Sequence, residues 1–303
     1  MQITKKIIQL LNFAAMISYN PKDWFKLITQ FRKNDTFVQL IPSMLGIGIL
    51  SAIVVLLELY VWHWSYKNIT VVHSILGFVL SMLLVFRTNS AYDRWWEGRK
   101  LWGNLVNQSR NLSIKINSYL KEKNDKQQIV DLINHYNYSL KNHLRGKRYD
   151  SENPELSAEL KSELATISHI PNYFANILNR KLVSLKEKNA LTEMQLLLLN
   201  TEFVAFTDIC GACERIKNTP IPYSYNIYLK KIIFLYVITL PFAFGPEFGF
   251  LTVFISMIVL YVFASIELIA EEIEDPFGAD DNDLPLDDLC EKIKANTQEI
   301  ISK

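Results

Sequence analysis

Apolar and polar residues are segregated along this chain into long blocks. Strongly apolar stretches occupy residues 37–64, 75–86, 228–244 and 248–270, whereas residues 102–225 are largely polar, with apolar positions at helical spacing. Spans of this kind match a hydrocarbon core about 30 Å thick, and they must be helical because lipid offers the backbone no hydrogen-bond partners. The pattern predicts an all-α integral membrane protein with four transmembrane helices and a helical cytosolic body.

The second apolar block runs into a charged segment without any helix-breaking signal. Residues 74–110 contain no proline, and their apolar first part ends at Phe86, just before Arg87. At about 1.5 Å per residue this segment would span about 55 Å, which exceeds the hydrocarbon thickness. We therefore expect the second membrane span and a cytosolic helix to form one continuous rod.

Two stripes of side chains follow this rod. Phe78, Met82 and Phe86 lie at positions i, i+4 and i+8 of one helical face. Residues of a second stripe are small and would let another helix come close: Ser74, Gly77 and Ser81. The apolar stripe is either buried core or, in symmetry-related copies around an axis, a hydrophobic neck that gates by dewetting. Periodicity leaves both interpretations open.

The blocks divide the chain into five parts. We predict N-terminal cytosolic or interfacial helices in 1–36, transmembrane helices 1 and 2 in 37–88, a cytosolic helical region continuing helix 2 in 89–227, transmembrane helices 3 and 4 in 228–270, and an acidic loop with a C-terminal cytosolic tail in 271–303. Basic residues precede the first span and follow the second. The positive-inside rule therefore places both termini in the cytoplasm of a multi-pass protein of the cell (inner) membrane.

Three features modify this picture of the spans. Glu58 is a carboxylate within the first span, where a charge is costly; we favour a position near the outer headgroups, within reach of water, over a functional role. Pro241 is expected to kink or end the third span. The sequence Gly-Pro-Glu at 245–247 carries no Lys or Arg and is expected to link the last two spans on the outside.

Two blocks resemble the signatures of the bestrophin family, in its prokaryotic branch. The first is FRTNSAYDRWWEGRKLWG, at residues 86–103, and the second is DPFGADDNDL, at residues 275–284. A weaker match is Cys210-Gly211 followed by Pro222. Together these matches run from the second span to near the C-terminus, so the resemblance covers most of the chain.

The resemblance implies a homopentameric ion channel with one central pore. The neck-lining positions of the family fall on Phe78, Met82 and Phe86, counted back from the first block, and the family usually has Ile or Phe where this chain has Met82. The position of a second, cytosolic constriction falls on Met194, whose alternative interpretation is a core residue. The family name implies chloride as the permeant ion, although prokaryotic members could pass sodium or potassium instead.

An acidic run follows the fourth span. In eukaryotic bestrophins the matching segment helps to form a calcium clasp. Carried over by position, its carboxylates would be Asp280 and Asp283, with backbone oxygens near Glu272 and Asp275; calcium takes several oxygen ligands of this kind. The alternative is a solvated acidic face that pairs with basic helix ends. No cofactor is expected to be required.

The remaining features exclude other functions. A net charge of +1 gives no broad basic surface, so no nucleic acid is expected as a partner. Cys210 and Cys213 form an isolated CxxC that suits a structural role, and the five histidines show no metal-binding spacing. The expected partners are the lipid bilayer, further copies of the chain and permeant monovalent ions. The chain is not expected to be an enzyme; the alternatives to a channel are a non-conducting membrane scaffold or a membrane enzyme.

Overall fold

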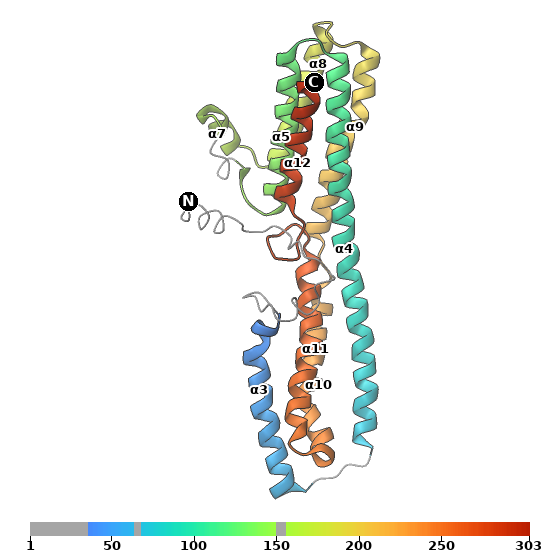
Figure 1. Cartoon of the computed structure of the whole chain (residues 1–303), viewed down its shortest axis with the longest axis vertical. Coiled ribbons are helices and arrows are strands. Elements are labelled where there is room, and N and C mark those ends of the chain that lie inside the picture. Colours follow the sequence, from blue (N-terminus) through green and yellow to red (C-terminus); the bar gives the residue numbers. More distant parts are fainter. Residues whose placement is uncertain (1–35, 64–67, 150–155) are drawn as a thin grey trace. The chain divides into compact units, whose positions relative to one another are not determined.

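The computed structural model describes residues 36–63, 68–149 and 156–303, and within these ranges it contains helices and no strands. The helices predicted before residue 36 lie outside the described residues. The described chain divides into two units: one is formed by the described parts of 18–94 and by 220–274, and the other by 95–219 and 275–303, again where described. The all-α prediction is confirmed (Figure 1).

The first unit contains the four segments that were predicted as membrane spans. Its helices are α3 (Thr36–Leu57), which continues into a π-helical turn (Glu58–Trp62), the first half of α4 (Ile69–Tyr119), α10 (Tyr223–Phe248) and α11 (Leu251–Glu274). Each is long and apolar enough to cross a membrane. Helix α3 packs against α10 and α11, and those two helices also pack against each other.

Helix α4 is a single helix of 51 residues. It contains no proline, and at about 1.5 Å per residue it is about 75 Å long. The prediction that an apolar span continues into a charged helix without interruption is therefore confirmed, and the helix is longer at both ends than the sequence suggested.

The predicted link at 245–247 is wrong, because α10 continues through it. Both Pro241 and Pro246 lie inside this helix, which ends at Phe248. Proline is tolerated within membrane helices because neighbouring groups satisfy the backbone groups that it frees. The chain instead turns at Gly249, whose φ of 52° is in the left-handed region that glycine adopts readily.

The second unit is a bundle with its own hydrophobic core. Besides the end of α4 it contains α5 (Lys123–Leu144), α7 (Ala158–Ala165), α8 (Ile170–Glu187), α9 (Glu193–Asn218) and α12 (Leu286–Ser302). The core includes the fully buried side chains of Trp102, Tyr136 and Phe206. Helix α12 lies in the predicted C-terminal tail and buries Leu289 and Ile293 in this core.

Helix α9 is a fifth segment with the length and composition of a membrane span. Its packing differs from that of a lipid-facing helix, because it lies against α8 and α5 and contributes Leu199, Phe206 and Ile209 to the core of the second unit. It also buries Glu202, which forms a 2.7 Å ion pair with Lys115 of α4. Part of its apolar surface therefore serves the bundle, whereas Met194, Leu197 and Leu198 stay exposed.

Candidate pore face and associated sites

The membrane half of α4 has one buried and one open side. The buried side repeats at intervals of three and four residues, as expected for one face of a helix: His73, Gly77, Leu80, Leu84, Arg87 and Ala91. Phe78, Met82 and Phe86 fall on the opposite side, at about 100° per residue. Their exposed fractions are 69%, 52% and 55%. The interpretation of these three residues as core of the chain is therefore wrong.

The predicted stripe of small residues is used in part for close helix packing. A Cβ atom on Gly77 would lie 2.6 Å from the hydroxyl oxygen of Tyr236 on α10, so only glycine fits there without a shift. Ser74 and Ser81 are exposed, and their hydroxyls donate to the carbonyls of Thr70 and Gly77 within α4. The close contact with α10 is thus made by Gly77.

Directly after the open stripe, Arg87 is fully buried. Its Nη2 donates to Glu274 Oε2 at 2.6 Å, and its Nε lies 3.7 Å from Glu267 Oε2. Glu274 also accepts a hydrogen bond from the backbone N–H of Ile221 at 2.7 Å, and its carbonyl accepts one from Arg94 Nε at 3.0 Å. Glu274 therefore joins α4, the segment just before α10 and the end of α11 in the first unit.

Within the second unit, the part of the first signature block that begins at Trp95 meets the second block. Trp95 Nε1 donates to the carbonyl of Asn282 at 3.0 Å. A Cβ atom on Gly98 would lie 3.1 Å from both Pro276 and Phe277, and the Phe277 ring is fully buried. Residues of the two blocks thus pack against each other, and the second block covers one face of the helix that carries Trp95 and Gly98.

Carboxylates of the acidic loop form a hydrogen bond with the loop backbone and an ion pair with a neighbouring lysine. Asp283 is 3% exposed, and its Oδ2 accepts the N–H of Asp280 at 2.7 Å. Asp275 Oδ2 lies 3.4 Å from Lys217 Nζ. Glu272 is half-buried on α11, in the other unit. Because these carboxylates carry such contacts, they already have a structural role, and calcium binding by the loop stays a prediction.

Of the two other predicted positions, Met194 is exposed and Glu58 is buried. Met194, in the first turn of α9, is 65% exposed, so it is not a core residue of this chain. Glu58 opens the π-helical turn and is 7% exposed, rather than accessible to water as predicted. Its Oε2 has no hydrogen-bond partner among the described residues, and it occupies the space that a Cβ on Gly245 would need.

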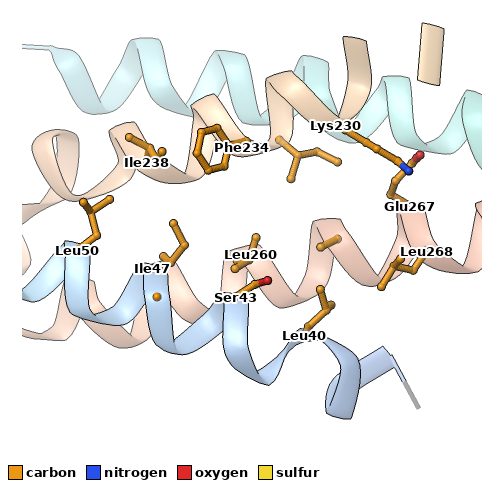
Figure 2. Close-up of a pocket in the computed structure, with 13 residues that line it drawn as sticks. Leu40, Ser43, Ile47, Leu50, Lys230, Phe234, Ile238, Leu260, Glu267 and Leu268 are labelled. Atoms are coloured by element: carbon orange, nitrogen blue, oxygen red, sulfur yellow. The ribbon is translucent and has the colours of Figure 1, made fainter. Parts of the chain in front are cut away.

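An apolar pocket of about 590 Å³ lies between α3, α10 and α11 of the first unit. Figure 2 shows Ile47, Phe234 and Leu260 lining it, with Lys230 and Glu267 together at one end. Both Glu267 carboxylate oxygens lack a hydrogen-bond partner among the described residues. The pocket therefore has mostly apolar walls and two charged residues at one end.

Sequence reasoning missed one cluster in the second unit. His143 of α5, His169 at the start of α8 and Glu214 of α9 place their side-chain ligand atoms within 4.8 Å of one another. The two histidines are 26 positions apart and the carboxylate follows 45 positions later, so no local spacing could have indicated them. Only the packing of α5, α8 and α9 brings them together.

Comparison with known proteins agrees with these features. The family model described as bacterial/fungal bestrophin protein matches residues 16–299. A voltage-dependent anion channel-forming protein of Synechocystis is 38% identical over 246 residues, covering 78% of this chain and 80% of that protein. One of the same description from Escherichia coli K12 is 32% identical over 92% of both chains. The crystal structure of a bacterial bestrophin homologue from Klebsiella pneumoniae superposes with a TM-score of 0.81 at 27% identity, covering 87% of this chain and 99% of that one.

Proposed function

Because this chain belongs to the bacterial and fungal bestrophin family, we propose that it assembles as a homopentamer around one central pore and conducts small monovalent anions such as chloride. The family resemblance expected from residues 86–103 and 275–284 is confirmed. The chain is a membrane protein of a channel-forming family and is not an enzyme. The number of copies, the permeant ion and the gate belong to the proposal.

The open side of α4 is the observation that carries the proposal. Phe78, Met82 and Phe86 stand on a face that the chain itself leaves uncovered, opposite the face that packs on its own helices. Five copies of this face around an axis would form an uncharged ring of apolar side chains. Such a constriction can gate by dewetting, since a narrow apolar passage holds water poorly.

Anion selectivity is supported by two arguments. Relatives of this chain in Synechocystis and Escherichia coli are named voltage-dependent anion channel-forming proteins. The ring edges of Phe78 and Phe86 carry positive partial charge, which favours an anion in a passage without fixed charge. Met82 adds a flexible apolar side chain that can still close a dry neck. Exposed Met194 would form the second constriction, in the cytosolic part of the pathway.

We place the protein in the cell (inner) membrane with both termini in the cytoplasm. Basic residues at the end of the membrane half of α4 and at the start of α10 support this orientation by the positive-inside rule. They include Arg94, Arg99, Lys230 and Lys231. The second unit, which begins at Trp95, would then be cytosolic.

The decisive experiment is the reversal potential of the purified, reconstituted protein in asymmetric potassium chloride. We expect a shift toward the chloride equilibrium potential, together with five copies per particle by native mass spectrometry. A shift toward the potassium potential would replace anion selectivity by cation selectivity in the same pore. Absence of current from intact pentamers, or a monomer in mild detergent, would favour a non-conducting scaffold.

We further propose that the channel needs no calcium, because Asp283 and Asp275 already hold contacts within the protein. The current should be the same in millimolar calcium and in excess chelator. If calcium changes the current, Asp280→Asn and Asp283→Asn should be compared, and loss of the calcium effect in both would restore the clasp hypothesis.

A further inference from the structure

The cluster of His143, His169 and Glu214 is built from three different helices of the second unit. His143 lies in the last turn of α5, His169 is the residue that caps the N-terminus of α8, and Glu214 lies in the last turns of α9. These helices pack on one another in a common core. The three side chains are therefore held by rigid elements, which is the condition for a preformed binding site.

Both imidazoles converge on one carboxylate oxygen. His143 Nε2 lies 2.6 Å and His169 Nε2 lies 2.8 Å from Glu214 Oε1, and the ring centroids are 4.6 Å apart. Burial alone would raise the pKa of the Glu214 carboxyl, but hydrogen bonds from His169 and His143 outweigh it and hold the pKa below its ordinary value. The three side chains thus already present their ligand atoms to one common point.

Two histidine nitrogens and one carboxylate form a ligand set suited to zinc and to similar divalent transition metals. Calcium and magnesium are disfavoured here because they prefer sites made of oxygen ligands. We propose that His143, His169 and Glu214 bind a divalent transition metal of the zinc class and so cross-link α5, α8 and α9.

A hydrogen bond to His169 lowers the affinity of this site for metal. Its Nδ1 accepts the backbone N–H of Asn172 at 3.1 Å, so the proton of the neutral ring lies on Nε2 in the metal-free protein. Coordination through Nε2 moves this proton to Nδ1, which then faces the Asn172 N–H. Metal binding therefore gives up the cap of α8, and the affinity is lower than that of a site whose histidines already carry the proton on Nδ1.

A cavity beside His143 could supply a fourth ligand from solvent. The side chains are half-buried, and His143 also lines a cavity of about 300 Å³ beside Lys147, Arg148 and Ser168. The cationic residues of this cavity oppose a bare cation but favour a water-derived hydroxide or another anion as the fourth ligand. Three protein ligands and one exchangeable ligand complete the tetrahedral geometry that zinc prefers.

The test uses the full-length protein in detergent, stripped of metal with a chelator. Titration calorimetry with zinc chloride should give one ion per chain, and the affinity should fall as the pH is lowered, because protons compete with the metal for its ligands. Cobalt(II) should give the intense visible absorption of a tetrahedral site. Absence of zinc binding up to about 100 μM, or the weak spectrum of an octahedral cobalt complex, would overturn the proposal.

Three variants assign the site. We expect Glu214→Gln and His143→Gln each to lower zinc affinity by about tenfold to a hundredfold or more, with thermal melts of the metal-free proteins showing that both remain folded. Asp280→Asn, in the acidic loop, is the matched control and should bind zinc as the unmodified chain does. The proposal fails if either folded variant at the cluster retains full affinity, or if the loop variant is the one that loses it.

Discussion

Arg87 and Glu274 form a 2.6 Å ion pair between residues 187 positions apart in the chain. The guanidinium is fully buried, and it directly follows Phe86, the last residue of the open stripe on α4. Burying two charges costs solvation free energy, which is offset by their mutual attraction and by the hydrogen bond that Glu274 accepts from the Ile221 N–H. The pair thus fixes α4 to the end of α11 next to the proposed neck.

Breaking this pair should destabilise the protein strongly. Replacing Glu274 by Leu leaves Arg87 buried without its nearest partner, which typically costs about 3–5 kcal/mol. Thermal unfolding in detergent measures the loss. The matched control is Glu271→Gln, which removes the exposed pair with Lys230 at 2.8 Å and should cost at most about 1 kcal/mol. Equal losses in the two variants would mean that the buried pair does not join the helices as described.

Phe86→Ala should widen the proposed neck and raise the open current roughly twofold or more, because truncation removes an apolar ring from each copy around the axis. Single-channel recording measures the effect. The control is Phe254→Ala on α11, since Phe254 is 64% exposed and Phe86 is 55% exposed. An unchanged current in Phe86→Ala, or an equal rise in the control, would remove Phe86 from the gate.

The three cysteines should be unreactive in the folded protein. Cys210, Cys213 and Cys290 are at most 2% exposed. Desolvation raises the pKa of Cys210 and of Cys290 to about 12 and also raises that of Cys213. Because the thiolate is the reactive form, a chromogenic disulfide reagent at pH 8 should modify none of them until denaturant exposes all three.

A cysteine introduced at an exposed position serves as the positive control for this assay. Lys121→Cys should add one thiol that reacts rapidly in the native protein, because residue 121 is exposed just before α5. Rapid modification of Cys210 or Cys213 in the unmodified chain would contradict their structural role and reopen a redox role for the CxxC pair.

Asp287 should stabilise the second unit in a pH-dependent way. Burial alone would raise the pKa of its carboxyl, but hydrogen bonds from Lys141 and Arg145, each 2.7 Å long, hold the pKa below its ordinary value of 3.8. The stabilisation is therefore complete above about pH 4–5 and is lost as the pH falls through the lowered pKa.

Asp287→Asn should accordingly lower stability by about 1 kcal/mol at neutral pH, or about 2–4 °C in Tm. The difference from the unmodified chain should shrink as the pH falls below about 4 and through the lowered pKa of Asp287, because protonation then removes the charge that the ion pairs need. Thermal melts from pH 3 to 8 measure this difference. Asp288→Asn, at the exposed neighbouring position, is the control and should change Tm little. A pH-independent deficit in Asp287→Asn would contradict the ion-pair explanation.

The membrane elements were predictable because hydrophobicity over some twenty residues reports directly on the solvent that surrounds a helix. The continuity of α4 was predicted from the absence of proline in residues 74–110. The error at 245–247 arose because proline and glycine end most soluble helices, whereas Pro241 and Pro246 remain inside α10. In a soluble protein, backbone groups freed by a proline can hydrogen-bond with water, so the helix can end there. Lipid offers no such partner, and a helix in the membrane therefore tends to continue through proline.

The candidate sites were predictable only in part. The positions of Phe78, Met82 and Phe86 on one face followed from helical periodicity, but the side of α4 that packs inward depends on partners such as Tyr236 and Glu274, which lie more than 150 residues away. The same limit applies to His143, His169 and Glu214. Their convergence is a property of tertiary packing, and no spacing along the chain encodes it.

The unbroken helix α4 constrains how the length of this protein can vary. Phe86 belongs to the open stripe, and Trp102, sixteen positions later on the same helix, is fully buried in the core of the second unit. One inserted residue between them would turn one side chain relative to the other by about 100°. No loop lies between the two residues to absorb the change. Insertions and deletions compatible with this architecture should therefore be confined to the connections between helices and be absent from residues 86–102.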